Sequence, residues 1–254
     1  MDWIGYITEA LKNTLLFLLV GISPWLIVAF IMQFLSNSLR KSLAKLIGLK
    51  AYIYLTCPGV MAHEIGHALF CIIFRHKIVE MKLFSPSDDG TLGYVNHSYN
   101  PNSLFQKTGN FFIGTGPIWL GITLVWLISS KMLPDGMLCV HEHFLSGTKN
   151  FLSCLFSLEF WSHWQSYLWL YLAITISSHV TLSPPDLSGS AKGSVSMIFF
   201  VLLIFLLTGW FGDWELAFIN WCKNLFISVI NILIFVIVLL IVLCTVGKII
   251  SLRK

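Results

Sequence analysis

Six long apolar runs divide the sequence. Five of them contain no Asp, Glu, Lys or Arg, namely residues 14–38, 109–130, 160–185, 193–212 and 224–247. The sixth run, residues 51–74, contains a single acidic residue, Glu64, and no lysine or arginine before its end. Each run approaches or exceeds the ~20 residues that a helix needs to cross a hydrocarbon layer ~30 Å thick. No run alternates polar and apolar residues, and helices satisfy their own backbone groups in lipid. The pattern therefore predicts an all-α polytopic membrane protein with about six transmembrane helices.

The composition supports this class. The chain has 254 residues, of which 56% are hydrophobic and 11% are charged, whereas a soluble domain carries about 25% charged residues. So few polar residues would not cover the surface of a soluble domain, which excludes an ordinary soluble enzyme or a disordered chain. The net charge of +4 is small and scattered, so we expect no nucleic-acid partner. Residues 1–254 are expected to form one membrane-embedded domain.

The distribution of cations predicts the orientation in the bilayer. With six crossings both termini lie on one face, which collects nine of the lysines and arginines against seven on the other. Cytoplasmic loops carry an excess of such cations, so both termini are expected to be cytoplasmic.

Two loops between the runs have distinctive content. Residues 79–99 contain two short β-type stretches around the turn formers Ser85-Pro86 and Asp89-Gly90, which predicts a small β-hairpin between the second and third helices. Cys139 and Cys154 share the loop between the third and fourth helices, and a disulfide there requires that this loop lie outside the cytoplasm. Histidines outside the runs' motifs are expected to be solvated or interfacial, namely His76, His97, His141, His143 and His163.

The second run contains the sequence His63-Glu64-Ile65-Gly66-His67, an HExxH motif. Residues i and i+4 lie on one face of a helix, so both imidazoles can bind one metal ion. Glu64 follows the first ligand and can activate a water molecule as a general base. An ionisable residue costs about 2.5–3.5 kcal/mol within a span, which favours a functional role for Glu64 over simple packing.

A catalytic zinc site requires a third protein ligand. Asp186 follows the apolar run 160–185, and Pro184 and Pro185 would end the helix just before it and turn its carboxylate inward. The second and fourth spans run in the same direction, so Asp186 is expected to reach the same half of the bilayer as the histidines. Two alternatives are a solvated role for Asp186 and a ligand role for Glu80, which follows the motif by thirteen residues.

These motifs resemble the site-2 proteases, which are zinc metalloproteases that cut substrate helices within the membrane. The resemblance covers residues 51–189 and rests on HEIGH in the second span, on Gly114-Thr115-Gly116-Pro117 in the third and on Asp186 after prolines. It implies one Zn²⁺ per chain held by His63, His67 and Asp186, with Glu64 as the catalytic acid/base. It also implies a catalytic core over residues 51–189 and a hairpin that pairs with an unwound substrate. The apolar runs place helices five and six after this core, in residues 193–247.

The chain departs from the family pattern at several positions. Val180-Thr181 stands where the family has Asn-Pro, Leu187 stands where it has a glycine after the Asp, and the Asn that often follows Gly-Pro is absent. The donor that would stabilise an oxyanion is therefore left open among three residues, Asn110, Ser178 and His179.

Three functions remain open from the sequence. The first is an intramembrane zinc endopeptidase acting in regulated intramembrane proteolysis. Its partners would be a substrate helix, the lipid bilayer and a membrane protein that delivers the substrate. The second is a membrane di-iron lipid hydroxylase or desaturase, although such enzymes need several histidine boxes and this chain has one. The third is a non-catalytic membrane scaffold that retains the motif.

Overall fold

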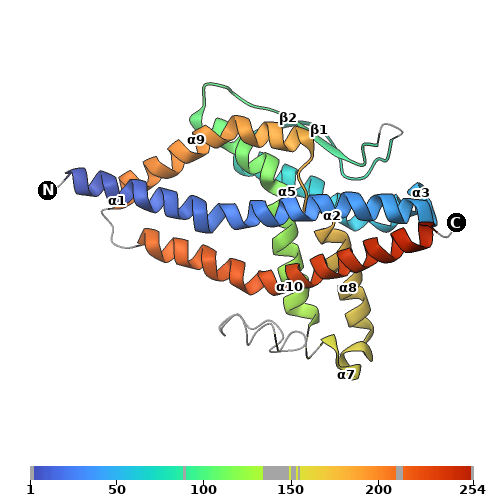
Figure 1. The fold of residues 1–254 in the computed structure, drawn as a ribbon. Coiled ribbons are helices and arrows are strands. Elements are labelled where there is room, and N and C mark those ends of the chain that lie inside the picture. The colour runs from blue at the N-terminus through green and yellow to red at the C-terminus, as the bar shows by residue number, and fades with distance from the viewer. Residues whose placement is uncertain are drawn as a thin grey trace.

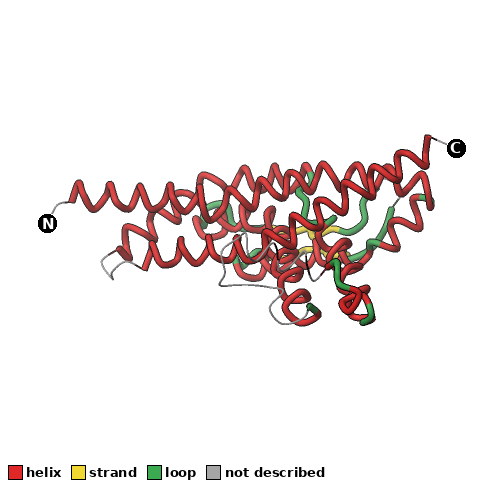
Figure 2. Tube along the Cα trace, turned by 60° about the horizontal axis from the view of Figure 1, so that its bottom comes forward, coloured by secondary structure: helices red, strands yellow, loops and turns green. Residues whose placement is uncertain are grey.

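The computed structural model describes residues 3–87, 90–133, 149, 153, 155–209 and 214–252. Helices make up most of this part of the chain, together with one two-stranded antiparallel sheet (Figures 1 and 2). The Cys139–Cys154 pairing and the positions of His141 and His143 lie outside the described residues.

A continuous helical run opens the chain and crosses the width of the molecule (Figure 1). It consists of α1 (Trp3–Leu16), a π-helical segment (Phe17–Ile22) and α2 (Ser23–Ile47). The C-terminal helix α10 (Trp214–Leu252) packs along α2. Fully buried apolar side chains of both helices fill their interface, including Met32, Leu39, Ile232 and Leu233. The first and last of the six runs therefore lie side by side.

The second run forms two short helices rather than one straight span. Helix α3 (Leu49–Leu55) and helix α4 (Cys57–Ile73) meet at a bend of 60°. Pro58 lies in the first turn of α4, where a missing N–H costs nothing, so a new helix can start there at a different angle. Helix α4 carries the HExxH sequence.

Two strands follow α4 in the chain. Strand β1 (Lys77–Lys82) pairs with β2 (Tyr94–Ser98) in an antiparallel register that sets Lys77 opposite Ser98 and Lys82 opposite Tyr94. A bulge interrupts the register between Ile78 and Glu80. After β2 the chain enters α5 (Leu104–Met132), a 29-residue helix that contacts both α4 and the later helix α9.

The fourth apolar run is not one helix, and Asp186 therefore does not lie where the sequence predicts. Helix α7 (Leu158–Trp161) precedes α8 (Trp164–Ser177), and the next helix, α9 (Pro184–Thr208), begins at the two prolines. Because Pro184 and Pro185 lack N–H groups, they fit the first turn of a helix and cannot continue α8. Asp186 therefore lies in the first turn of α9, not at the end of the fourth span.

Several helices are long and apolar enough to cross a membrane, so the structure is compatible with an integral membrane protein. The described residues contain four such helical segments, Trp3–Ile47, Leu104–Met132, Pro184–Thr208 and Trp214–Thr245. The bent pair α3–α4 raises the number to five if it acts as one span. Helix α8, with 14 residues, is about 21 Å long and falls short of the expected span.

Candidate metal centre

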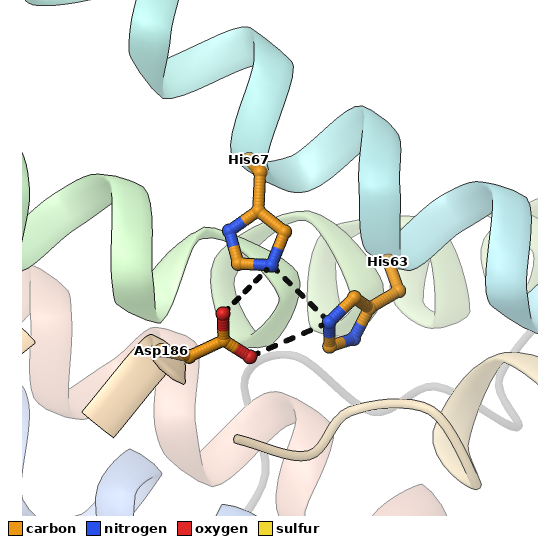
Figure 3. A group of neighbouring side chains, drawn as sticks. All are labelled: His63, His67 and Asp186. Carbon is orange, nitrogen blue, oxygen red and sulfur yellow. Dashed lines mark hydrogen bonds and ion pairs between the residues drawn. The ribbon is translucent and has the colours of Figure 1, made fainter. Parts of the chain in front are cut away.

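Three ligand side chains meet between α4 and α9 (Figure 3). His63 and His67 lie one turn apart on α4, and their Nε2 atoms are 3.2 Å from each other. Asp186 approaches from α9, with Oδ2 3.6 Å from His63 Nε2 and Oδ1 3.3 Å from His67 Nε2. One ligand atom of each residue lies within 4.8 Å of the others. The structure thus brings together the three residues that the sequence selects as metal ligands.

A capping box fixes Asp186 at the start of α9. The Asp186 N–H donates to the Ser183 hydroxyl at 3.3 Å, and the Ser183 N–H donates to Asp186 Oδ2 at 2.8 Å. This reciprocal pair satisfies two backbone donors that the helix leaves unpaired, and it restricts the carboxylate to one orientation. The same geometry that caps the helix therefore aims Asp186 at the two histidines.

Two backbone carbonyls orient the imidazoles. The Nδ1–H of His63 donates to the carbonyl oxygen of His179 at 2.9 Å, and the Nδ1–H of His67 donates to that of Ile113 at 2.7 Å. A carbonyl only accepts, so each Nδ1 carries a proton, and in the neutral imidazole each Nε2 then presents a lone pair. Two nitrogen lone pairs and a carboxylate then face one point, an arrangement that a metal ion or a shared proton stabilises. The donor set therefore fits a metal ion, with the carbonyls orienting its ligands.

Each orienting carbonyl is free for a specific reason. In a regular helix the Ile113 carbonyl would accept from the N–H of residue 117, but that residue is Pro117, which has none. His179 follows the end of α8, where helical carbonyls lack partners along the chain. Pro117 and the break after α8 thus release the two acceptors that hold His67 and His63.

Small residues allow α5 to lie close to both ligand-bearing helices. A Cβ on Gly66 of α4 would lie 2.8 Å from the Gly116 backbone of α5. A Cβ on Gly114 would lie against the Asp186 carbonyl and the Ser190 side chain of α9. Glycine has no side chain, so at these positions the backbones of two helices can touch, which is the closest packing seen between membrane helices. Helix α5 therefore sets the distance between the HExxH helix and Asp186.

The cluster opens into a cavity of about 690 Å³. Glu64 lines this cavity beside the histidines and is 7% exposed. Residues 90–97, which include most of β2, form part of the same wall, and Gly93 lies against the Glu64 side chain. Glu64 can therefore reach water or a bound chain in the cavity.

The three residues considered as oxyanion donors all line this cavity. The Ser178 hydroxyl donates to the Thr175 carbonyl at 2.9 Å, and the Nδ1–H of His179 donates to the same carbonyl at 3.0 Å. Asn110 on α5 is 7% exposed, and its side chain makes no hydrogen bond to another described residue. Asn110 is thus the donor best placed to bind a group in the cavity.

His76 and His97 form a pair next to the strands. His76 Nε2–H donates to the Gln106 carbonyl at 2.8 Å, so its Nδ1 accepts from the Nδ1–H of His97 at 3.0 Å. Burial lowers the pKa of His76. The pKa of His97 is also lowered, mainly by burial and to a smaller extent by the nearby charge of His76. Both shifts favour the neutral imidazoles. Of the two alternatives expected for His76, solvated or interfacial, the first does not hold, because His76 is 6% exposed and stacks on Tyr99. His163, by contrast, is exposed.

Glu80 does not join the metal cluster. Its carboxylate accepts from the Tyr94 hydroxyl at 2.6 Å and lies 3.9 Å from Lys82 Nζ on the same strand. The side chain is 52% exposed. The geometry therefore favours Asp186 over Glu80 as the third ligand.

Sequence reasoning missed a group of polar residues on α2. The group lines the cavity and consists of Gln33, Ser36, Asn37 and Arg40. Their spacing of i, i+3, i+4 and i+7 is the signal that would have found them, since such residues share one helix face.

Searches against protein-family models, curated protein sequences and solved structures find no match to this chain.

The role of Pro117 can be tested by replacing it. In Pro117→Ala the new N–H of residue 117 competes with His67 for the Ile113 carbonyl, so we expect metal affinity to fall by ~10–100-fold, as for other groups that orient ligands. The control is Pro24→Ala, because Pro24 begins α2, far along the chain from the cluster. Chelator competition on the purified proteins measures the affinities. Equal affinities in Pro117→Ala and the parent chain would contradict the proposed role.

Proposed function

We propose that the protein is an intramembrane zinc endopeptidase that resembles the site-2 proteases. The observation that carries the proposal is the convergence of His63, His67 and Asp186, each aimed so that an unprotonated ligand atom faces the others. Glu64 is buried and lines the cavity next to this cluster. Two neutral imidazoles and one carboxylate are a set found at catalytic zinc sites that keep a position open for water.

His63, His67 and Asp186 would hold one Zn²⁺ per chain. When bound, zinc supplies Lewis acidity, which lowers the pKa of water to about 7 and polarises a carbonyl. A 2-His-1-carboxylate set also suits non-haem iron, so metal analysis separates the peptidase from an iron enzyme. The described residues contain one such ligand group, which favours a single metal ion over the di-iron arrangement.

The residues of the chain have distinct roles in the proposed peptide hydrolysis. The Glu64 carboxylate accepts a proton from the attacking water and returns it to the leaving amine nitrogen, a transfer worth ~10²–10⁴-fold in rate. The Asn110 amide N–H donates to the oxygen of the carbonyl that is attacked. His63 and His67 keep their Nδ1 protons on backbone carbonyls throughout.

The substrate of this reaction is a membrane-protein helix that unwinds at the cleavage site. Helical hydrogen bonds shield peptide carbonyls, so the segment that enters the cavity must be extended. Strand β2 lines the cavity, and its main chain can pair with an extended segment by strand addition. The small sheet between the second and third membrane helices would thus present the substrate to Glu64, after delivery by a membrane partner.

We also propose that the chain crosses the membrane six times, with α3–α4 as the second crossing and α8, together with the residues that flank it in the apolar run, as the fourth. Both termini are then cytoplasmic, as the excess of cations on that side indicates. A reporter fused after Lys254 should be found in the cytoplasm, and one inserted near Thr148 on the opposite side. Detection of both reporters on one side of the membrane would contradict six crossings.

Metal content tests the ligand set. Asp186→Ala removes a carboxylate from the cluster, so we expect the purified protein to lose most of its zinc and all peptidase activity. Glu80→Ala removes an exposed carboxylate outside the cluster and should retain both. Elemental analysis of the two variants beside the parent chain measures the metal. Iron in place of zinc, or zinc lost from Glu80→Ala but kept by Asp186→Ala, would refute the proposal.

The catalytic role of Glu64 is tested by Glu64→Gln, which keeps the size of the side chain and removes its basicity. We expect about one zinc per chain, as in the parent protein, and a fall in cleavage of at least ~10²-fold. The assay follows cleavage of a membrane-spanning peptide in reconstituted bilayers. Unchanged cleavage by Glu64→Gln would show that another group carries the proton.

A further inference from the structure

A polar stripe on α2 forms a second wall of the cavity. We use this name for Gln33, Ser36, Asn37 and Arg40, which share one face of the helix and all line the cavity. Between Pro24 and Leu39 the remaining residues of α2 are apolar, apart from Ser38. Polar groups in a membrane helix are costly and mark functional surfaces, so their alignment toward one cavity needs an explanation.

Most of the stripe's hydrogen-bonding capacity is unused within the described part of the chain. Ser36 donates to the Ser178 carbonyl, which fixes α2 against the end of α8. Gln33 Oε1 is buried without a partner. Arg40 is half-buried and forms no ion pair or hydrogen bond with another described residue. A buried amide oxygen that has no partner among the described residues favours a ligand that pairs with it, and Arg40 lies on the same helix face and lines the same cavity.

Arg40 supplies a permanent side-chain positive charge to the cavity wall. It is the only lysine or arginine among the described lining residues, whereas Glu64 and Asp186 are acidic. Its Nη2 lies 3.7 Å from the position of a Cβ on Gly90, where the cavity-lining segment 90–97 begins. Its charge also acts on His179, whose carbonyl orients His63. Arg40 therefore lies beside the segment that includes β2, and its charge reaches His179.

We propose that the α2 stripe binds an unwound peptide segment opposite β2, and that Arg40 binds a carboxylate on that segment. The amides of Gln33 and Asn37 pair with main-chain groups that lose their helical partners when the segment unwinds. A guanidinium binds a carboxylate through two parallel hydrogen bonds, which gives geometric selectivity. The inference rests on the proposed function, because it takes the occupant of the cavity to be the peptide that is cut.

A peptide fits Arg40 better than an anionic lipid does. The guanidinium lines the same cavity as Glu64 and β2, where a main chain must lie in order to be cut. The carboxylate has two sources, an Asp or Glu side chain or the peptide's own C-terminus, and both present the same group to Arg40. The test below separates these sources and includes anionic lipid as a competing occupant.

Binding, not cleavage, provides the test. The probe is a fluorescent apolar 20-residue peptide with one central Glu, compared with its Gln analogue, both with amidated C-termini. A third peptide carries the central Gln and a free C-terminal carboxylate. Anisotropy measures their binding to the full chain carrying Glu64→Gln, in phosphatidylcholine nanodiscs. We expect the Glu peptide to bind ~10–100-fold more tightly than the amidated Gln peptide. If only the peptide with the free C-terminal carboxylate binds more tightly than the amidated Gln peptide, the group that Arg40 binds is the C-terminus of the peptide.

Substitutions on α2 assign the preference to Arg40. Arg40→Gln should abolish the preference without changing binding of the Gln peptide, which also shows that the variant is folded. Arg40→Glu should instead favour a peptide with a central Lys, a gain that misfolding does not produce. Lys41→Gln is the matched control, because it removes the adjacent cation, which is exposed and outside the cavity. Asn37→Leu should weaken all peptides alike.

Three results would overturn the inference. These are equal binding of the Glu, Gln and free-carboxylate peptides, equal loss of preference in Lys41→Gln and Arg40→Gln, or loss of the preference when phosphatidylglycerol replaces phosphatidylcholine. The last result would assign Arg40 to lipid phosphate. Because binding is measured in a Glu64→Gln chain, a failure of the proposed peptidase appears separately, as absence of cleavage by the parent protein.

Discussion

The arrangement of the site depends on one constraint, which is that three electron-pair donors must face one another inside an apolar bundle. An imidazole presents Nε2 reliably only if its Nδ1 proton is held elsewhere, and in a helical bundle nearly every carbonyl already has a partner. The chain meets this demand with irregularities in its helices. Pro117 frees the Ile113 carbonyl for His67, and the end of α8 frees the His179 carbonyl for His63. The breaks in regular structure are therefore part of the candidate metal centre.

Asp186 and helix α5 also combine a structural role with a role in the candidate site. The carboxylate caps α9 through Ser183 and faces the histidines at the same time, so the helix cannot start at another residue without moving a ligand. Glycines on α5 let its backbone touch α4 on one side and α9 on the other. A larger side chain at Gly114 or Gly116 would push apart the helices that carry the ligands. Packing and chemistry are consequently set by the same few positions.

Much of this could be read from the sequence, because the signals are local. The spacing of His63 and His67 defines one helix face, and the absence of charges from long runs indicates membrane helices. The assignment of Asp186 to the fourth span failed because the apolar run continues to Pro185, and proline both ends a helix and begins one. The capping pattern Ser183-Pro-Pro-Asp186 carries the missing information, since it marks a helix start. The bend of 60° between α3 and α4 falls inside an uninterrupted apolar run, where hydrophobicity alone does not mark it, although Pro58 in the first turn of α4 allows a new helix to start there.

The polar stripe on α2 shows a different limit of sequence reasoning. Counting charged residues makes the run 14–38 look uniformly apolar, because Gln33, Ser36 and Asn37 are polar but uncharged. Only the helical period shows that they share a face, and only the tertiary structure shows that this face meets the cavity of the candidate metal centre. An apolar bundle has few places where water and a polar main chain can be accommodated. Here the stripe, the edge of β2 and the ligand cluster line the same space, so the polar groups of the first span and the chemistry of the second belong to one site.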